Sequence, residues 1–429
     1  MTTEMQPLRI VRHSLPSEDR YLYFNPVSAA FVVTNKLGSK IIEDYISGKA
    51  SHEFIKMIST KGIFDRPDRT SYGESPERLI LELTTACNLR CRTCYMVASK
   101  PAPEELTTTE IERLLDEASK AGCKTVALMG GEPLLRDDII PITRFALDRF
   151  QQVQISTNGT LDARQLVKEF KHSKNLTIQI SLDGPDAQSN DRIRGKGSFQ
   201  KARSFMGALS SAGISTTLST VLNAYNYNLV AKMCEFACEV GASAVIFHKV
   251  HVVGRAEDFP DIIPTAEQLM HGMGMILKMF YDYGVSGRLM VDFPHNRWIR
   301  GDTLIDAAHP VCHFGRAFAF VTSRGDLVCC SHLRDGEFVC GNIRKKSLLE
   351  IWNTSPTLAA MRNLTVEEIP SCAMCEFKYI CRGSCRADAL GASGSILGDP
   401  PDCDALKRYY RYVLDHYART IDPVIPEVG

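Results

Sequence analysis

Three cysteines near residue 90 have a spacing that suits a metal cluster. Cys87, Cys91 and Cys94 form a C-x3-C-x2-C pattern, which a chain of this composition should contain by chance only about 0.02 times. Three thiolates can hold three irons of a cubane [4Fe-4S] cluster and leave the fourth iron open to a small chelating molecule. Structural zinc is the alternative, but it usually takes four ligands in closed C-x2-C pairs. The pattern therefore favours an iron-sulfur cluster with one open iron.

A second group of cysteines lies near the C-terminus, and its spacing is rarer still. It contains Cys312, Cys330, Cys372, Cys375, Cys381, Cys385 and Cys403. A zinc ribbon on the four cysteines from 372 to 385 is the alternative, but it would leave the other three without a role. The chain has 15 cysteines, and its first residues lack the apolar stretch of a signal peptide, so we expect a cytoplasmic protein with reduced, metal-binding thiols.

Composition limits the classes of partner. Hydrophobic residues make up 44% of the 429 residues, but no apolar run is long enough to span a membrane, so we expect no membrane partner. The 50 basic residues balance the 50 acidic ones, and nucleic-acid binding usually needs a basic excess, so we expect no nucleic-acid partner. The length predicts two or three domains.

Short apolar runs alternate with helical stretches from residue 78 onward. The runs span residues 78–84, 124–129, 152–157, 176–182, 215–222 and 242–247. This alternation predicts an α/β fold with a partial (βα)6 barrel, in which reactive groups gather where strands end. Cys87 follows the first run, Gly130-Gly131-Glu132-Pro133 follows the second, and polar or glycine residues follow the next two.

The two ends of the chain have different patterns. Residues 20–33 read as a hairpin around Asn25-Pro26, followed by a helix at 36–46 and another that begins at Ser51. Residues 65–76 are rich in proline, glycine and charge, as linkers are. After about residue 300 the βα alternation stops. We therefore expect domains at 1–75, 76–300 and 301–429.

The cysteine triad and its surroundings resemble a known family. Cys87-Asn-Leu-Arg-Cys91-Arg-Thr-Cys94-Tyr95, directly after a strand and followed one unit later by Gly-Gly-Glu-Pro, is similar to the radical S-adenosylmethionine (SAM) superfamily. The resemblance implies that SAM binds the open iron through its amino and carboxylate groups. One electron, from an external reductant of the flavodoxin or ferredoxin class, would then yield a 5′-deoxyadenosyl radical that abstracts hydrogen from a substrate.

The same resemblance implies residues that contact SAM. Gly130, Gly131 and Glu132 would meet the methionine amino group. The ribose or methionine part would be held by Ser156, Asn158 and Ser181, the carboxylate by Arg194, and the adenine by Leu222 and the backbone at Tyr95.

The C-terminal cysteines resemble the SPASM extension of radical SAM maturases, which implies two auxiliary [4Fe-4S] clusters. Cys312, Cys330 and Cys385 would hold the first, and Cys372, Cys375, Cys381 and Cys403 the second. The first set lacks a fourth cysteine, since residues 300–311 offer only Asp302, Asp306 and His309 as ligands. A non-cysteine ligand, an open iron, or Cys329 would complete it.

The N-terminus favours a peptide substrate. Residues 8–62 resemble the small winged-helix domain of peptide-modifying systems, which binds a leader peptide by adding it as a strand to its sheet edge. We therefore expect a maturase that acts on a ribosomally made precursor peptide and forms a cross-link or another oxidative modification.

Three alternatives stay open. In a sulfatase-maturing enzyme we would expect tyrosine and aspartate where this chain has Thr93 and Ser331. A dehydrogenase or epimerase of a sugar or other small molecule is the second, and an iron-sulfur electron carrier is the third. The pattern names no general base, and Asp183, His248, His332 and Asp335 are only candidates.

Overall fold

The computed structural model describes residues 10–25, 30–49, 53–64, 73–284, 286–294, 311–312 and 315–426. The chain divides into two compact units. The first unit comprises Met1–Ser71, His295–Cys312 and Leu364–Gly429, and the second comprises Tyr72–Pro294 and His313–Asn363. This is a division by compactness, so the domain boundaries predicted above remain a prediction.

The second unit contains the predicted parallel strands. They are β4 (Arg78–Glu82), β5 (Thr125–Met129), β6 (Gln152–Thr157), β7 (Leu176–Ser181), β8 (Ser215–Leu222) and β9 (Ala244–Lys249). Each pairs in parallel with the next along the chain. The six strands of the partial barrel are confirmed, with bounds within two residues of the prediction.

Strands that the sequence did not predict lengthen this sheet at both ends. The three residues of β10 (Met290–Asp292) pair in parallel with β9, and β11 (Phe318–Val321) pairs in parallel with β4. Two antiparallel strands follow β11, namely β12 (Asp326–Val328) and β13 (Val339–Asn342). The stretch after residue 313 therefore continues the barrel sheet.

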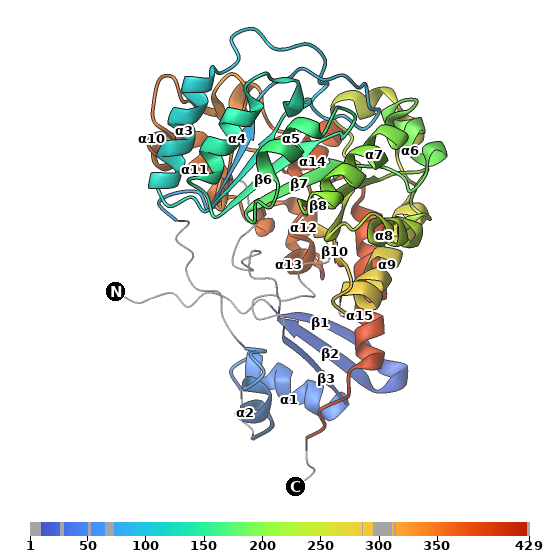
Figure 1. Cartoon of the computed structure of the whole chain (residues 1–429). Coiled ribbons are helices and arrows are strands. Elements are labelled where there is room, and N and C mark those ends of the chain that lie inside the picture. The colour runs from blue at the N-terminus through green and yellow to red at the C-terminus, as the bar shows by residue number, and fades with distance from the viewer. Residues whose placement is uncertain are drawn as a thin grey trace. The chain divides into compact units, whose positions relative to one another are not determined.

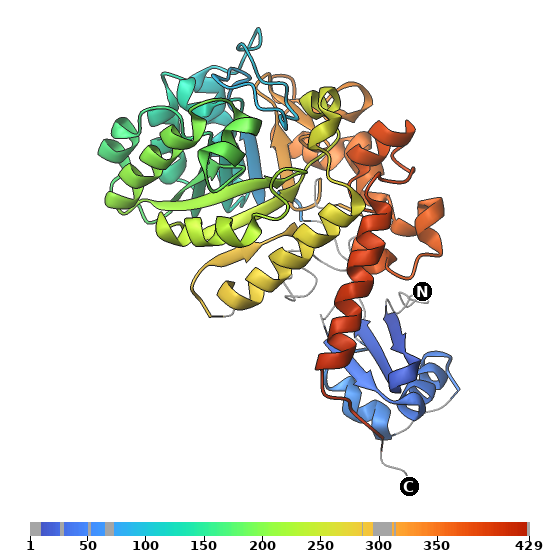
Figure 2. The same cartoon turned by 90° about the vertical axis from the view of Figure 1, so that its right-hand side faces the viewer.

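Helices connect the parallel strands and cover one face of the sheet (Figures 1 and 2). They are α3 (Thr108–Lys120), α4 (Ile139–Leu147), α5 (Arg164–Phe170), α6 (Ala187–Arg194), α7 (Ser198–Ser211), α8 (Val230–Glu239) and α9 (Ala266–Met279). In α3, Thr107 and Glu110 form a capping box, which satisfies two backbone N–H groups at the helix start. Two further helices, α10 (Leu348–Thr354) and α11 (Pro356–Asn363), complete the unit.

Side chains alternate along the parallel strands. In β6, Val153 and Ile155 are buried, whereas Gln152, Gln154 and Ser156 are half-buried. Hydrogen bonds link the half-buried set across strands, since Gln154 Nε2 lies 3.0 Å from Gln179 Oε1 of β7. In a closed βα barrel, apolar side chains fill the interior. Here the face of the sheet opposite the helices carries polar side chains instead, so this face is suited to a polar ligand.

The first unit contains a small antiparallel sheet of β1 (Val11–Leu15), β2 (Arg20–Asn25) and β3 (Ala30–Thr34), in that order. The predicted hairpin is confirmed as β2 and β3, and the helix predicted at 36–46 is α1 (Lys36–Ile46). The next helix, α2, spans Glu53–Ser59; its predicted start, Ser51, lies outside the described residues. Strand β1 was not predicted.

Both faces of this small sheet are covered. On one face, Tyr23 and Val32 pack with residues of α1 and α2, including Ile42 and Phe54. On the other lies the C-terminal helix α15 (Cys403–Thr420). His13 Nε2 lies 2.5 Å from Asp415 Oδ1, and the rings of Phe31 and Tyr417 stack with centroids 4.7 Å apart. The two edge strands of this sheet are β1 and β3.

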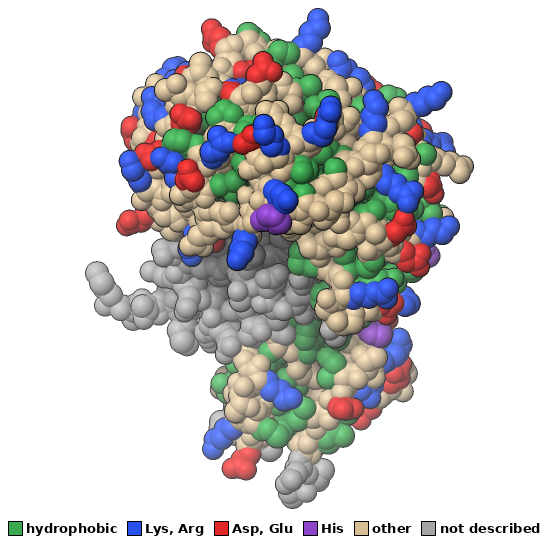
Figure 3. Space-filling model, viewed as in Figure 1, with side chains coloured by type: hydrophobic (Ala, Val, Ile, Leu, Met, Phe, Trp, Pro, Cys, Tyr) green, Lys and Arg blue, Asp and Glu red, His purple; other side chains and the backbone are tan. Residues whose placement is uncertain are grey.

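Three short helices precede α15: α12 (Pro370–Ala373), α13 (Lys378–Cys381) and α14 (Arg386–Ser393). Among the described residues, no helix combines the length and apolar character that crossing a membrane requires. Basic and acidic side chains are interspersed on the face seen in Figure 3, as expected from the balanced charge.

Candidate cofactor site

The cysteine triad lies in the loop that follows β4. Cys87, Cys91 and Cys94 are all half-buried. Burial is the main cause that raises the pKa of the Cys91 thiol to about 11, and its interactions with Cys87 and Cys94 add to the rise. The three sulfurs therefore lie close enough to repel one another as thiolates. Bound iron would reverse this balance, because a coordinated thiol loses its proton. The donor set thus fits an iron-sulfur cluster.

A glycine and an arginine that the sequence interpretation missed hold this loop in place. A side chain at Gly254 would lie 2.4 Å from the Tyr95 carbonyl oxygen, so only glycine permits the contact. Arg255 donates from its backbone N to Cys94 O at 3.0 Å, and from Nη1 to Cys91 O at 2.9 Å. A Gly-Arg pair soon after the sixth predicted strand, β9, was the available signal, since strand ends form the reactive rim.

The Gly-Gly-Glu motif lies against the chain that leads into Cys87. Gly131 N donates to Thr84 O, and Glu132 N donates to Ala86 O, both at 2.7 Å. A Cβ on Gly130 would lie 2.4 Å from Thr84 O, and one on Gly131 would lie 2.2 Å from Ala86 O. The two glycines are therefore required by a close approach of two backbones, and this approach places Glu132 beside the cluster loop.

Glu132 is fully buried and accepts three hydrogen bonds. The donors are Thr157 Oγ1 and Asn158 N, both at 2.7 Å, and Leu134 N at 3.1 Å. Burial nevertheless raises the pKa of the Glu132 carboxyl to about 7. A buried carboxylate is stabilised by a nearby cation, so this position fits the amino group of SAM.

Two of the predicted polar contacts also have structural partners. Asn158 Nδ2 donates to Asn88 Oδ1 at 2.8 Å, which ties the end of β6 to the cluster loop. Ser156 lies on the polar face of the sheet, where its Oγ accepts from Gln154 Nε2 at 3.0 Å. Ser181 is half-buried at the end of the neighbouring strand β7. Ser156 and Ser181 are thus on adjacent strands beside the motif.

Arg194 forms a buried ion pair that the sequence did not indicate. Its Nε lies 2.9 Å from Asp183 Oδ2, and the Asp183 side chain is fully buried. The other carboxylate oxygen, Oδ1, accepts from Val221 N at 2.8 Å. The backbone oxygen of Arg194 lies 4.0 Å from Cys91 Sγ. Asp183, considered above as a general base, is therefore fixed against Arg194 next to the cysteine loop.

The two residues predicted to flank adenine differ in their surroundings. Leu222 is fully buried, and a side chain at Gly272 of α9 would lie 2.8 Å from Leu222 Cδ2. The Leu222 side chain therefore contacts α9, and its predicted contact with adenine stays a prediction. The ring of Tyr95 lies 4.5 Å from that of His332, which in turn lies 4.5 Å from the ring of His251.

Four C-terminal cysteines gather within the first unit. Cys372, Cys375, Cys381 and Cys403 interact electrostatically. Burial is the largest cause that raises the pKa of Cys381 to about 12, followed by Asp402 and the other three thiols. Cys403 is the first residue of α15. Four converging thiols match the ligand set predicted for the second auxiliary cluster.

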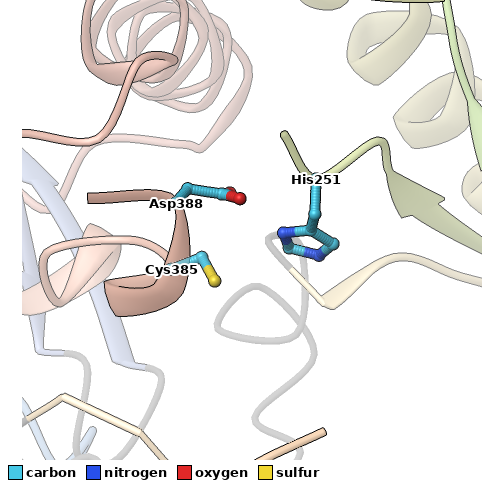
Figure 4. A group of neighbouring side chains, drawn as sticks. All are labelled: His251, Cys385 and Asp388. Atoms are coloured by element: carbon cyan, nitrogen blue, oxygen red, sulfur yellow. The ribbon is translucent and has the colours of Figure 1, made fainter. Parts of the chain in front are cut away.

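The ligands predicted for the first auxiliary cluster belong to different units, with Cys312 and Cys385 in the first and Cys330 in the second. Their common cluster stays a prediction. Cys385 and Asp388 lie together at the start of α14 (Figure 4), with a carboxylate oxygen and the sulfur within 4.8 Å of one another. Cys329 Sγ lies 3.6 Å from Cys340 Sγ. Asp302, Asp306 and His309 lie outside the described residues.

Known proteins and family models are similar to this chain in sequence. The model of the radical SAM superfamily matches residues 81–237, and that of the SPASM iron-sulfur cluster-binding domain matches residues 312–376. The AdoMet-dependent heme synthase of Methanosarcina barkeri is 30% identical over 350 residues, which cover 77% of this chain and 96% of that protein. The mycofactocin maturase MftC of Mycolicibacterium smegmatis is 29% identical over 77% of this chain and 83% of its own length.

A solved structure has the same fold. The crystal structure of Streptococcus suis SuiB bound to precursor peptide SuiA superposes with a TM-score of 0.62 at 15% identity, over 92% of this chain and 98% of that one. The motif geometry, the family models and the relatives agree. The chain belongs to the radical SAM superfamily and carries a C-terminal SPASM domain, so it is an enzyme that uses SAM and [4Fe-4S] clusters.

Proposed function

We propose that this enzyme is a maturase of a ribosomally synthesised precursor peptide, in which it forms a cross-link or another oxidative modification. The observation that carries the proposal is the small sheet of the first unit. Helices cover both of its faces, so a partner must approach the edges at β1 or β3. An exposed strand edge recognises an extended peptide through main-chain hydrogen bonds. MftC is named a maturase, and SuiB was crystallised with a precursor peptide.

Within this proposal, the individual site residues have the following roles. Cys87, Cys91 and Cys94 would hold the SAM-binding cluster. Cys372, Cys375, Cys381 and Cys403 would hold the second auxiliary cluster, and Cys312, Cys330 and Cys385 the first. When bound, SAM and its cluster supply the radical that abstracts hydrogen from the substrate.

The chain's own residues would bind and orient SAM. Glu132, held by Thr157 and Asn158, would accept a hydrogen bond from the amino group. The Arg194 guanidinium, which is suited to a carboxylate, would be oriented by Asp183. Ser156, Asn158 and Ser181 would offer polar contacts to the ribose or methionine part. Gly130 and Gly131 would keep this wall of the site close to the cluster loop.

We further propose that a flavodoxin or ferredoxin in the cytoplasm supplies the electron.

A second candidate function is modification of a porphyrin-like small molecule. It is favoured by the 30% identity to an AdoMet-dependent heme synthase, almost the whole of which is matched. This function would give no role to the sheet edges of the first unit.

The two candidates are separated by one experiment. Anaerobic enzyme with reconstituted clusters, SAM and dithionite is incubated either with a candidate peptide encoded beside its gene or with an iron porphyrin. A peptide mass lower by about two units per modification, as loss of two hydrogens requires, supports the maturase. Consumption of the porphyrin, together with an unchanged peptide, supports the second candidate and refutes the first.

A further inference from the structure

The segment that follows α15 lies along β3. Val424 N donates to Val33 O at 2.7 Å, and Thr34 Oγ1 donates to Val424 O at 2.6 Å. The Val424 side chain packs against the core formed by the sheet with α1 and α2. Arg20 donates from Nη2 to Ile421 O at 2.7 Å, which fixes the end of α15. The chain's own C-terminal segment therefore engages the small sheet.

This segment has the character of an incomplete strand. Val424 is half-buried, Ile425 is 55% exposed and Pro426 is buried, which is the alternation of a strand on a sheet edge. Pro426 stands two positions after Val424, so its nitrogen would face β3, but it has no N–H group to donate to a ladder. In the described part of the segment, Val424 supplies the single backbone hydrogen bond to β3. A peptide with all of its N–H groups would form more of them.

The bond to Val33 lies on the edge that an added strand would use. Because β2 pairs with one side of β3, the Val33 carbonyl that Val424 contacts points to the other side, the outer edge. Backbone groups alternate along a strand, so those of Phe31 point to this edge as well. An extended peptide added to β3 would need the groups of Phe31 and Val33. Val424 already occupies one of them.

We propose that residues 421–426 act as a built-in competitor, which holds the β3 edge until an extended peptide displaces it. This inference rests on the proposed function, because it concerns the edge that the precursor peptide would use. One net hydrogen bond corresponds to about a fivefold change in an equilibrium constant. Loss of the Val424 bond should therefore tighten peptide binding about fivefold, since less of the edge is blocked.

The test uses the full chain and a synthetic probe. The probe is a fluorescein-labelled decapeptide with the sequence of residues 420–429 in which both prolines are replaced by threonine. Its affinity is measured by fluorescence anisotropy for the wild type, for Val424→Pro, which removes the donor N–H, and for the matched control Val424→Thr, which keeps the donor and the branched shape. We expect about fivefold tighter binding to Val424→Pro and an affinity within twofold of wild type for Val424→Thr.

A second measurement needs no variant. Hydrogen exchange of residues 420–426 in the wild type should accelerate when the probe saturates the protein, because the segment has left β3. Equal affinities of wild type and Val424→Pro, failure of the probe to bind either, or an unchanged exchange rate at saturation would each overturn the proposal. Neither readout involves substrate modification. If the enzyme modifies a porphyrin instead of a peptide, the proposed function fails, while displacement at β3 is still measured.

Discussion

A buried ion pair joins the first barrel strand to the segment after β12, and its removal should destabilise the second unit. Glu82, at the end of β4, is fully buried, and its Oε2 lies 2.6 Å from Arg334 Nη2. The other carboxylate oxygen accepts from Ser323 Oγ at 2.8 Å. The perturbation is Glu82→Gln, which keeps the shape of the side chain and removes the charge.

The size of the effect follows from the burial of both partners. Breaking a buried pair costs about 3–5 kcal/mol, because the remaining charge stays in the protein without its counter-charge. The Arg334 side chain is 19% exposed, so the lower end of about 3 kcal/mol applies. In a unit of this size that corresponds to a fall in Tm of roughly 6–12 °C. The double variant Glu82→Gln with Arg334→Met removes both charges and should be more stable than Glu82→Gln alone.

Thermal unfolding of the anaerobic, cluster-containing protein by calorimetry measures the effect, with iron content checked in each variant. The matched control is Glu239→Gln. Glu239 pairs with Arg203 at 2.6 Å, but the two side chains are 58% and 49% exposed, and exposed pairs contribute at most about 1 kcal/mol. A Tm loss for Glu82→Gln no larger than that of the control, or a double variant less stable than Glu82→Gln, would refute the reasoning.

Three further predictions concern the cofactor site. Cys91→Ser should lower the iron content by about four irons per chain, which is one cubane cluster, and should abolish 5′-deoxyadenosine formation. The control Cys123→Ser, which replaces a buried thiol outside the motifs, should change neither quantity. Gly131→Ala should weaken SAM binding at least tenfold in equilibrium dialysis, because the new Cβ would lie 2.2 Å from Ala86 O; binding within twofold of wild type would contradict this. Without SAM, the Glu132 pKa of about 7 lies above the usual 4.5, so its contribution to stability is full below pH 4.5 and is lost as the pH rises through 7. The unfolding free energy of wild type relative to Glu132→Gln should therefore fall by roughly 3 kcal/mol between pH 4.5 and 8 in denaturant titrations, and a pH-independent difference would show that the carboxyl is not perturbed.

The parallel strands and the two motif glycines could be predicted from the sequence, because their signals lie within a few neighbouring residues. Each parallel strand is a short apolar run between turn residues, and Gly130 and Gly131 stand where two backbones touch. Strand β1, with the sequence Val-Arg-His-Ser-Leu, has a weak apolar pattern because one of its faces is completed by α15. Contacts such as His13 with Asp415, 402 residues apart, have no local signature.

The orientation of site residues was harder to predict, because contacts with other elements also determine it. A shift of one position along a strand moves a side chain to the other face, and the strand pattern alone did not show that Leu222 contacts α9. Asp183 and Arg255 are ordinary polar residues in the sequence. Asp183 acts through its pair with Arg194, at the end of the next helix α6, and Arg255 through its bond to the Cys91 carbonyl, 164 residues away.

The central claim is that the radical formed at the cysteine triad removes hydrogen from a precursor peptide. The most direct test is transfer of deuterium from a perdeuterated candidate precursor, encoded beside the gene, to 5′-deoxyadenosine, read by mass spectrometry after reduction with SAM. The account predicts 5′-deoxyadenosine that is heavier by one mass unit and a modified peptide in matching amount. Unlabelled 5′-deoxyadenosine with an unmodified peptide would contradict it.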